Sequence, residues 1–405
     1  MTSHSSSHSP LPDRNSMILI GASTRAFADC WRRAGFDCLC VDEYADADLS
    51  VWANVYGSIQ ELIASAEYAT NPPVAWCYSG PMEYENLSEL SQRLGLTCWG
   101  NNTTQVHQLR NFREQLSRST SGIKPVCCLS TSQAAHHLKQ GKQVVLKPNH
   151  SSAGAQTQWA TLSRLNDWSD EDQQSLRLEP FLEGKVWGIS CLGTPTGVEV
   201  LGICESVTIS QWLGEDSIAF PFRYAGSIGP LVMSNGFMKQ VHTLVDELFE
   251  QIGPIGLFGI DLVETQNELY LLEINPRFTS SMELLDLTGT KAIATAHAAC
   301  FEANLPSQTL HSKIPALKPR WKRVVYTQQS IQWPSVDWNK VASELGGRCS
   351  LTQTDQPMVL ADLPDAGSFS PPGAPVVTMY GYGPPSESHA MREAFCQAIN
   401  LNGLL

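Results

Sequence analysis

The chain has 405 residues, of which 42% are hydrophobic and 17% charged, fractions typical of an ordinary globular protein. Its length exceeds that of one typical core, so two or three domains are expected. The net charge of −13 argues against non-specific nucleic-acid binding, which needs a basic surface. No apolar run reaches membrane-spanning length, and the Ser/His/Pro-rich residues 1–16 lack the apolar core of a signal peptide. The composition therefore predicts a soluble cytoplasmic protein with a disordered tail over 1–16 and no nucleic-acid or membrane partner.

The twelve cysteines are scattered along the chain. They include no Cys-x-x-Cys pair, so neither a zinc site nor a redox motif is indicated. We expect most of them to be small buried thiols in a reducing compartment.

A strand–helix–strand unit opens the folded part of the chain. Residues 17–20 and 38–41 are apolar strands, and an amphipathic helix is predicted over 24–34, which implies a parallel sheet. Asp42 lies 21 residues after Gly21 (42 − 21 = 21), a spacing known from dinucleotide-binding folds. The loop between them lacks the second and third glycines of that motif, so NAD or FAD binding is disfavoured.

A further strand at 74–78 opens into a polar loop that contains Glu83 and Asn86. Open parallel sheets bind ligands at the carboxyl ends of their strands, so both residues are candidate substrate contacts. An alternative is that Glu83 supports the first turn of the following helix.

The middle of the chain contains a candidate phosphate site. Residues 101–122 are predicted to be helical, and a strand at 144–146 leads into Lys147 and a small-residue loop, 150–155. One fixed cation and backbone N–H groups suit phosphates, although an ordinary hairpin turn is the alternative.

Two further segments are weaker candidates. Residues 179–184 read Glu-Pro-Phe-Leu-Glu-Gly, and an extended linker of this kind can offer backbone groups to a purine edge while Phe181 and Leu182 flank the ring. Arg223 lies in an aromatic, glycine-containing loop at 220–227 and could receive a substrate carboxylate, although a structural turn suits this segment equally.

The most informative segment places Asp261, Glu273, Asn275 and Arg277 on two adjacent strands joined by the polar turn 265–268. A hairpin with that turn brings the two carboxylates together, and alternate residues of a strand leave the same face. Carboxylate and amide oxygens suit Mg²⁺, and an arginine beside them can hold a phosphate or an oxyanion. The set therefore predicts a metal–phosphate site.

The remainder of the chain shows ordinary elements and no internal repeat. Helices are expected over 282–287, 289–303 and 386–399, and a strand near 321–326. Residues 361–381 are expected to be rich in turns.

The order of these motifs resembles the ATP-grasp superfamily from Met17 to about Phe301. Within it, segment 21–26, the Glu83-x-x-Asn86 pattern and segment 361–364 are similar to a carboligase-like branch related to biotin carboxylase. The resemblance implies an α/β fold, α+β overall, with a Rossmann-like N-terminal domain, a two-subdomain ATP-grasp fold and a small C-terminal segment. The corresponding boundaries are 17–100, 101–305 and 306–405.

The resemblance also implies roles for the matching residues. It implies ATP and Mg²⁺ as cofactors, with Mn²⁺ as an alternative ion, and an acyl phosphate formed from a carboxylate and captured by an amine. The partners it implies are small acid and amine substrates. It also implies a link to one-carbon cofactor metabolism and a homodimer, as in other members. The implied ATP contacts are Arg110, Lys147, Ser152, Gly154, Glu179, Phe181, Leu182 and Glu183; the implied metal ligands are Asp261, Glu273 and Asn275; Arg277 stabilises the reacting species.

Three departures from the family pattern accompany this resemblance. The phosphate loop has one glycine, Arg110 or Arg113 replaces an expected lysine, and only Glu183 lies near the position of the ribose carboxylate. Two alternatives stay open: a biotin-carboxylase-like enzyme with a separate carrier, and a nucleotide-binding regulatory protein with a degenerate site. The complete hairpin set argues against the second.

Overall fold

The structure is a computed structural model, and it describes residues 16–213, 221–266, 268–286, 293–302, 319–351, 357–384 and 386–399. The tail expected over 1–16 lies outside these residues apart from Ser16. Part of the helix expected over 289–303 also lies outside them.

A four-stranded parallel sheet of order β3-β2-β1-β4 forms the first part of the fold, as the strand–helix–strand pattern predicts. Alternate residues of β1 face opposite sides, so Met17 and Leu19 pack in one buried cluster while Ile18 and Ile20 pack in another. Its elements are β1 (Ser16–Gly21), α1 (Arg25–Arg33), β2 (Asp37–Asp42), η1 (Ala47–Val51), β3 (Asn54–Tyr56), α2 (Ile59–Ala64), α3 (Ala66–Thr70), β4 (Ala75–Tyr78), η2 (Met82–Tyr84) and α4 (Leu87–Leu94).

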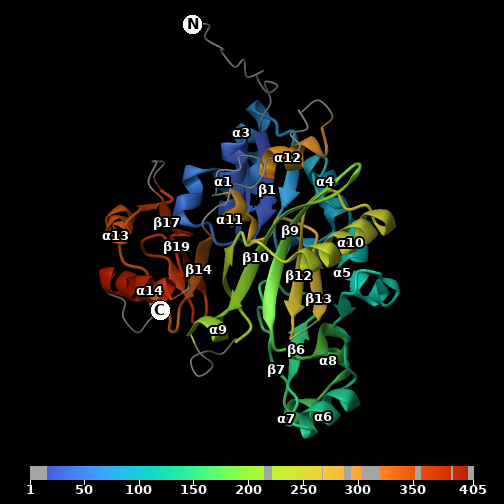
Figure 1. Cartoon of the computed structure of the whole chain (residues 1–405). Coiled ribbons are helices and arrows are strands. Elements are labelled where there is room, and N and C mark those ends of the chain that lie inside the picture. The colour runs from blue at the N-terminus through green and yellow to red at the C-terminus, as the bar shows by residue number, and fades with distance from the viewer. Residues whose placement is uncertain are drawn as a thin grey trace, which may run out of the picture.

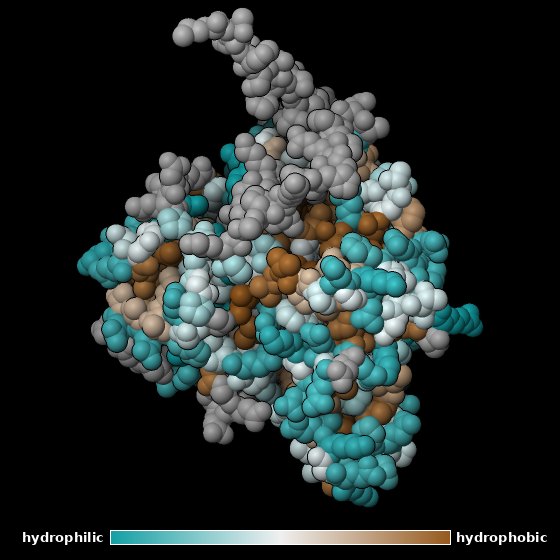
Figure 2. All heavy atoms as spheres, viewed as in Figure 1, coloured by the Kyte–Doolittle hydropathy of each residue, from teal (hydrophilic) through white to brown (hydrophobic). Residues whose placement is uncertain are grey.

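A three-stranded antiparallel sheet of order β7-β6-β8 follows and forms the projection at the bottom of Figure 1. Its viewed surface is mainly hydrophilic (Figure 2), and its core is a separate apolar cluster that includes Val144, Leu146 and Leu178. The segment that precedes this part contains α5 (Thr103–Arg110), η3 (Phe112–Arg118) and β5 (Lys124–Pro125). The part itself contains α6 (Thr131–Lys139), β6 (Val144–Pro148), β7 (Gln158–Trp159), α7 (Leu162–Asn166), α8 (Asp170–Ser175) and β8 (Leu176–Pro180).

A ten-stranded sheet, mostly antiparallel, spans the rest of the molecule in the order β16-β17-β19-β14-β11-β10-β9-β12-β13-β5. Pairing of β11 with β14 carries this sheet across the boundary predicted at residues 305 and 306, which itself lies outside the described residues. Its first half contains β9 (Lys185–Thr194), β10 (Gly197–Thr208), α9 (Ile209–Leu213), β11 (Tyr224–Gly229), α10 (Asn235–Gln251), β12 (Gly256–Glu264), β13 (Leu269–Asn275), α11 (Met282–Asp286) and α12 (Ile293–Ala299).

The C-terminal part adds the other edge of this sheet and packs beside the first sheet through the β17–β19 region (Figure 1). It contains β14 (Arg320–Tyr326), β15 (Ile331–Gln332), α13 (Trp338–Glu344), β16 (Arg348–Cys349), β17 (Met358–Ala361), β18 (Phe369–Ser370), β19 (Pro375–Tyr382) and α14 (Glu387–Ala398). The predictions of a strand near 321–326 and a final helix are confirmed.

Two expectations about elements are wrong in part. The single helix expected over 101–122 breaks at Asn111, which lies at φ −98° and ψ 4°, and a 3₁₀ helix follows it. The segment 361–381 is not rich in turns throughout, because Val376–Tyr380 forms the buried middle of β19 between β17 and β14. Prolines at 371, 372 and 375 conceal that strand in the sequence.

Most cysteines are buried, as expected: eight of the twelve lie in the interior, and only Cys127 and Cys128 are exposed. In the described part of the chain, no helix is both long enough and apolar enough to cross a membrane.

Candidate active site

The predicted hairpin forms from β12 and β13, and it sets Asp261 directly opposite Glu273 in the antiparallel register. Gly259 faces Asn275 in the same ladder, and the backbone N–H of Thr265 closes the turn by donating to the Glu268 carbonyl at 3.0 Å. Directly opposed residues of an antiparallel pair have side chains within a few ångströms of each other. The hairpin thus concentrates two acidic groups at one place on the sheet.

The polar ends of three residues converge at this point. Asn275 Nδ2 lies 2.9 Å from Asp261 Oδ2 and 3.4 Å from Glu273 Oε1. Rotation of the amide by 180° would present its oxygen to the same point. Two carboxylates and an amide oxygen are a donor set that fits Mg²⁺, with water and phosphate completing the shell. No group of three or more His, Cys, Asp or Glu residues suited to a metal occurs in the described ranges, and this set reaches three donors only by including the Asn275 amide.

The two carboxylates differ in their readiness to ionise. Burial and the neighbouring Glu273 carboxylate raise the pKa of Asp261 to about 7. Burial opposes ionisation of Glu273 as well, but four surrounding cations lower the pKa of Glu273: Lys147, Arg110, Arg177 and Arg277. The Asp261 and Glu273 carboxylates repel each other when both are ionised, and a bound divalent cation would relieve that repulsion.

Arg277 is held by the loop that follows β4. Its Nε donates to Glu83 Oε1 at 2.9 Å, and its Nη1 donates to the Phe278 carbonyl at 3.2 Å. Burial opposes the charged form of Arg277, but the ion pair with Glu83 raises the pKa of Arg277 overall. Gly80 makes this approach possible, because a Cβ there would lie 2.8 Å from the guanidinium carbon of Arg277 and 2.9 Å from Ser152 Oγ.

The predicted phosphate loop, 150–155, lies beside Arg277 through Ser152. Gly154 adopts φ +69°, and a Cβ there would clash with the Phe222 carbonyl oxygen, so glycine is required at this one position. The loop is anchored further by the Tyr224 N–H, which donates to the Ala153 carbonyl at 2.9 Å. The loop therefore bridges the small sheet and the start of β11.

Lys147 and Glu179 form a cluster on β6 and β8, where the register places the neighbouring Arg177 opposite Lys147. Glu179 accepts from Arg113 Nη1 at 2.6 Å and from Arg177 Nε at 3.0 Å, and its other oxygen lies 3.2 Å from Lys147 Nζ. Burial opposes ionisation of Glu179, yet these three cations lower the pKa of Glu179 to about 2. Its carboxylate is thus engaged with cations that a nucleotide phosphate would also attract.

The remaining predicted hinge residues lie between β8 and β9. Phe181 is half-buried in an aromatic group with Trp159 (4.9 Å between ring centroids) and Phe222 (6.0 Å). Leu182 is half-buried beside it, and Glu183 is exposed. Trp159 and Phe222 complete an apolar wall that the sequence did not reveal, because they come from distant segments.

Two predicted substrate contacts have structural partners. The Asn86 side chain caps α4 by accepting from the Glu89 N–H at 3.1 Å. Arg223 donates to the Gly373 carbonyl and lies over the Tyr326 ring, 5.1 Å from its centroid. These partners hold Asn86 at the start of α4 and Arg223 beside the C-terminal part of the chain.

Asp42 explains why the dinucleotide hypothesis is disfavoured. Its carboxylate is buried and accepts from the Thr24 hydroxyl at 2.7 Å and from the backbone N–H groups of Thr24, Tyr44 and Ala45. These bonds occupy the oxygens that a ribose hydroxyl would need.

The structure adds Tyr84 to this site and pairs it with His150, the first residue of the predicted loop 150–155. Their rings stack at 4.7 Å and 22° between the loop after β4 and the phosphate loop. Only the proximity of two loops 66 residues apart reveals them (150 − 84 = 66).

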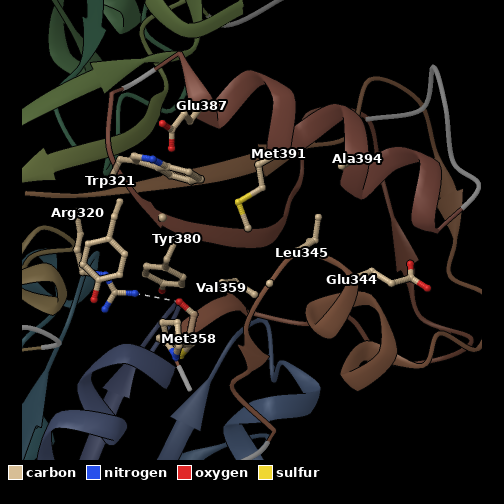
Figure 3. Close-up of a pocket in the computed structure, with 14 residues that line it drawn as sticks. Arg320, Trp321, Glu344, Leu345, Met358, Val359, Tyr380, Glu387, Met391 and Ala394 are labelled. Carbon is tan, nitrogen blue, oxygen red and sulfur yellow. Dashed lines mark hydrogen bonds between the residues drawn. The ribbon is translucent and has the colours of Figure 1, made fainter. Parts of the chain in front are cut away.

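A separate cavity of about 400 Å³ lies in the C-terminal part (Figure 3). Arg320, Trp321 and Tyr380 line it from β14 and β19, while Met391 faces it from α14. None of its lining residues belongs to the predicted site.

Comparison with known proteins agrees with this geometry. Residues 114–281 match the family described as the ATP-grasp domain, and the chain therefore contains an ATP-grasp domain. Its mixed α/β fold, with the parallel sheet at the N-terminal end, resembles solved structures that cover 94% to 95% of this chain.

Among solved structures, N5-carboxyaminoimidazole ribonucleotide synthetase from Thermotoga maritima is similar with a TM-score of 0.61 and 14% identity, covering 95% of this chain and 98% of that one. L-amino acid ligase from Bacillus licheniformis gives 0.62 and 14%, covering 94% and 97%. Biotin carboxylase from Campylobacter jejuni gives 0.62 and 12%, covering 95% and 91%.

Among curated proteins, an uncharacterized protein of Methanocaldococcus jannaschii is 21% identical over 341 residues, covering 78% of this chain and 79% of the relative.

Proposed function

We propose that this protein is an ATP-dependent ligase that activates a carboxylate as an acyl phosphate and transfers the acyl group to an amine. The observation that carries the proposal is the convergence of Asp261, Glu273 and Asn275 beside Arg277. Similar solved structures include an L-amino acid ligase and a carboxylase domain that was solved with MgADP and bicarbonate. Their activities support the proposal by analogy of fold.

Cationic, aromatic and acidic residues of the site would bind different parts of Mg²⁺-ATP. Lys147, with Arg113 and Arg177 beside it, would attract the nucleotide phosphates, since all three cations form ion pairs with the same carboxylate, Glu179. The aromatic wall at Phe181 would receive the base. Asp261, Glu273 and Asn275 would hold Mg²⁺, which supplies neutralisation of phosphate charge and alignment of the transferred group.

Arg277 lies where the reacting oxygens would meet. In the first step the substrate carboxylate oxygen forms a bond to the γ-phosphorus while the bond to the ADP oxygen breaks. In the second step the amine nitrogen bonds to the acyl carbon, phosphate leaves, and the amine loses a proton. Arg277 would stabilise the negative oxygens in both steps, and burial strengthens that interaction because water is excluded.

The test is Mg²⁺-dependent formation of ADP from ATP in the presence of pooled carboxylic acids and amines. We expect ADP and phosphate to form only with a suitable acid–amine pair. Glu273→Gln should lower the rate on the order of a hundredfold or more, because it removes a negative ligand at the point of phosphoryl transfer. Release of AMP and pyrophosphate would contradict the acyl-phosphate mechanism.

Glu268→Gln is the matched control, since Glu268 lies in the turn of the same hairpin and pairs with the exposed Lys124. It should leave ADP formation unchanged. Glu273→Gln should lower the melting temperature only slightly, because the lost attraction between Glu273 and the surrounding cations is offset in part by removal of the repulsion that raises the pKa of Asp261. Equal loss of activity in both variants would indicate damage to the hairpin rather than loss of a metal ligand.

A further inference from the structure

One turn of 3₁₀ helix, η2, carries two consecutive side chains that hold different parts of the candidate site. Glu83 accepts from Arg277 Nε at 2.9 Å. Tyr84, the next residue, donates its hydroxyl to the Ser151 carbonyl of the phosphate loop at 3.1 Å. The loop after β4 thus contacts both the group proposed to stabilise the reaction and the loop proposed to cover the phosphates.

The Tyr84 side chain has three separate contacts. Its ring stacks on His150 with centroids 4.7 Å apart and planes 22° from parallel. Arg110 lies over the ring, 4.9 Å from its centroid, and donates to the Tyr84 hydroxyl. That hydroxyl therefore accepts from Arg110 while it donates to Ser151, which orients it in one direction.

The phosphate loop is held on two sides. On the side of the first sheet, the loop is held by Tyr84 and by Ser152, whose hydroxyl lies against Gly80. The opposite side is the bond from the Tyr224 N–H to the Ala153 carbonyl. Because the second bond joins backbone atoms, a side-chain substitution does not remove it, whereas the contacts to Tyr84 can be removed by substitution.

From these contacts we propose that Tyr84 and His150 are positioning residues that keep the phosphate loop closed against the loop holding Arg277. The effect of these residues on catalysis rests on the function proposed above. Their effect on the mobility of residues 150–157 does not depend on that function. A shift of η2 would move Glu83 and Tyr84 together, so the position of Arg277 and closure of the phosphate loop are coupled through one short element.

The test is amide hydrogen exchange of residues 150–157 in the full-length protein without nucleotide. Tyr84→Phe keeps the ring stack and removes the hydroxyl, so the exchange rate should rise about fivefold, the effect of one ordinary hydrogen bond on an opening equilibrium. His150→Ala should also raise it, and His150→Phe, which keeps a stacking ring, should stay near the wild-type rate.

Tyr68→Phe is the matched control, since Tyr68 also donates its hydroxyl to a backbone carbonyl, that of Leu94, within the first sheet domain. It should leave exchange in 150–157 unchanged. An unchanged rate in Tyr84→Phe, or the same rise in Tyr68→Phe, would overturn the proposal.

Steady-state kinetics separate this inference from the proposed function. If both hold, Tyr84→Phe should raise KM for ATP several-fold with a smaller change in kcat, because loop closure rather than chemistry is weakened. If neither the wild type nor any variant turns over ATP while Tyr84→Phe still raises the exchange rate in 150–157, the positioning role holds and the ligase proposal fails. If ATP is turned over while exchange does not respond, the ligase proposal stands and the positioning role fails.

Discussion

At the scale of single residues, identical side chains acquire different roles from their neighbours. Asp42 and Asp261 both follow apolar strand residues, and Asp42 is buried while Asp261 is half-buried. Asp42 receives bonds from the Thr24 side chain and three backbone N–H groups, so its lone pairs are already occupied. Asp261 has the Asn275 amide and the repelling Glu273 carboxylate, and it is therefore available to a cation.

His297 illustrates the same dependence on neighbours for a titrating group. Its Nδ1 accepts from the Leu257 N–H at 2.9 Å, and its Nε2 lies 2.9 Å from the Trp99 carbonyl, which together specify the neutral tautomer with the proton on Nε2. Burial lowers the pKa of His297 to about 4. Protonation would place an uncompensated charge in the core and remove the acceptor for Leu257.

This shift predicts a pH-dependent stability. The unfolded chain takes up a proton near pH 6.5 and the folded one only near pH 4, so stability is complete above 6.5 and falls as pH drops from 6.5 to 4. The loss attributable to His297 should approach about 3 kcal/mol in the free energy of unfolding. Urea unfolding at several pH values measures it.

His297→Gln should flatten this part of the profile, because glutamine can keep one donor and one acceptor without titrating in that range. His242→Gln on the exposed face of α10 is the control and should leave the slope as it is. An unchanged slope in His297→Gln would contradict the assignment of the pH dependence to this histidine.

At the scale of elements, polar residues near helix ends decide where helices begin and stop. Asn102 begins α5 with a capping box, and Asn111 ends it. Asn86 caps the start of α4 with its side chain alone, although the sequence also suited it to substrate binding. Helix capping and ligand binding use the same amide oxygen, so the sequence pattern does not separate the two roles.

Asn86→Ser distinguishes these roles. Serine is also a good N-cap, so the free energy of unfolding should stay within a few tenths of a kcal/mol of wild type, whereas Asn86→Ala should cost about 1 kcal/mol. If Asn86 acts only as a cap, Asn86→Ser should keep full ADP formation. Loss of activity in Asn86→Ser at unchanged stability would instead assign the residue to the substrate.

At the scale of the whole molecule, a buried charged group joins the first sheet to the C-terminal part. Arg25 at the start of α1 donates to Glu283 of α11 at 2.5 Å, to Asp362 after β17 at 2.8 Å and to the Tyr380 hydroxyl of β19 at 2.9 Å. Burial opposes ionisation of Glu283, but Arg25 and Lys322 lower the pKa of Glu283. The position of the first domain is thus coupled to the sheet that contains the candidate site.

Arg25→Met should destabilise the protein by about 3–5 kcal/mol, since Asp362 then keeps only neutral donors such as the Thr378 hydroxyl and Glu283 loses one of its two cations. Arg32→Met on the same helix removes an exposed ion pair with Asp37 and should cost at most about 1 kcal/mol. Urea unfolding compares the two. Equal costs would show that the buried group does not couple these parts of the chain.

Much of this organisation follows from local sequence. The hairpin of Asp261 and Glu273, the strand ending at Lys147 and the first parallel strands depend on alternation and turn residues a few positions apart, and the structure confirms these elements. The end of the helix at Asn111 and the strand β19 were mispredicted, because a backbone bend and flanking prolines obscured the local pattern.

The partners of the site's charged groups depend on tertiary contacts. Arg277 meets Glu83 across 194 positions, and Tyr84 meets Ser151 across 67. No local periodicity encodes such pairs, because each arises only when separate sheets pack together. The residue types and their order along the chain therefore indicate phosphate chemistry, whereas packing decides which carboxylates can bind a metal, which neutralise cations and which cap a helix.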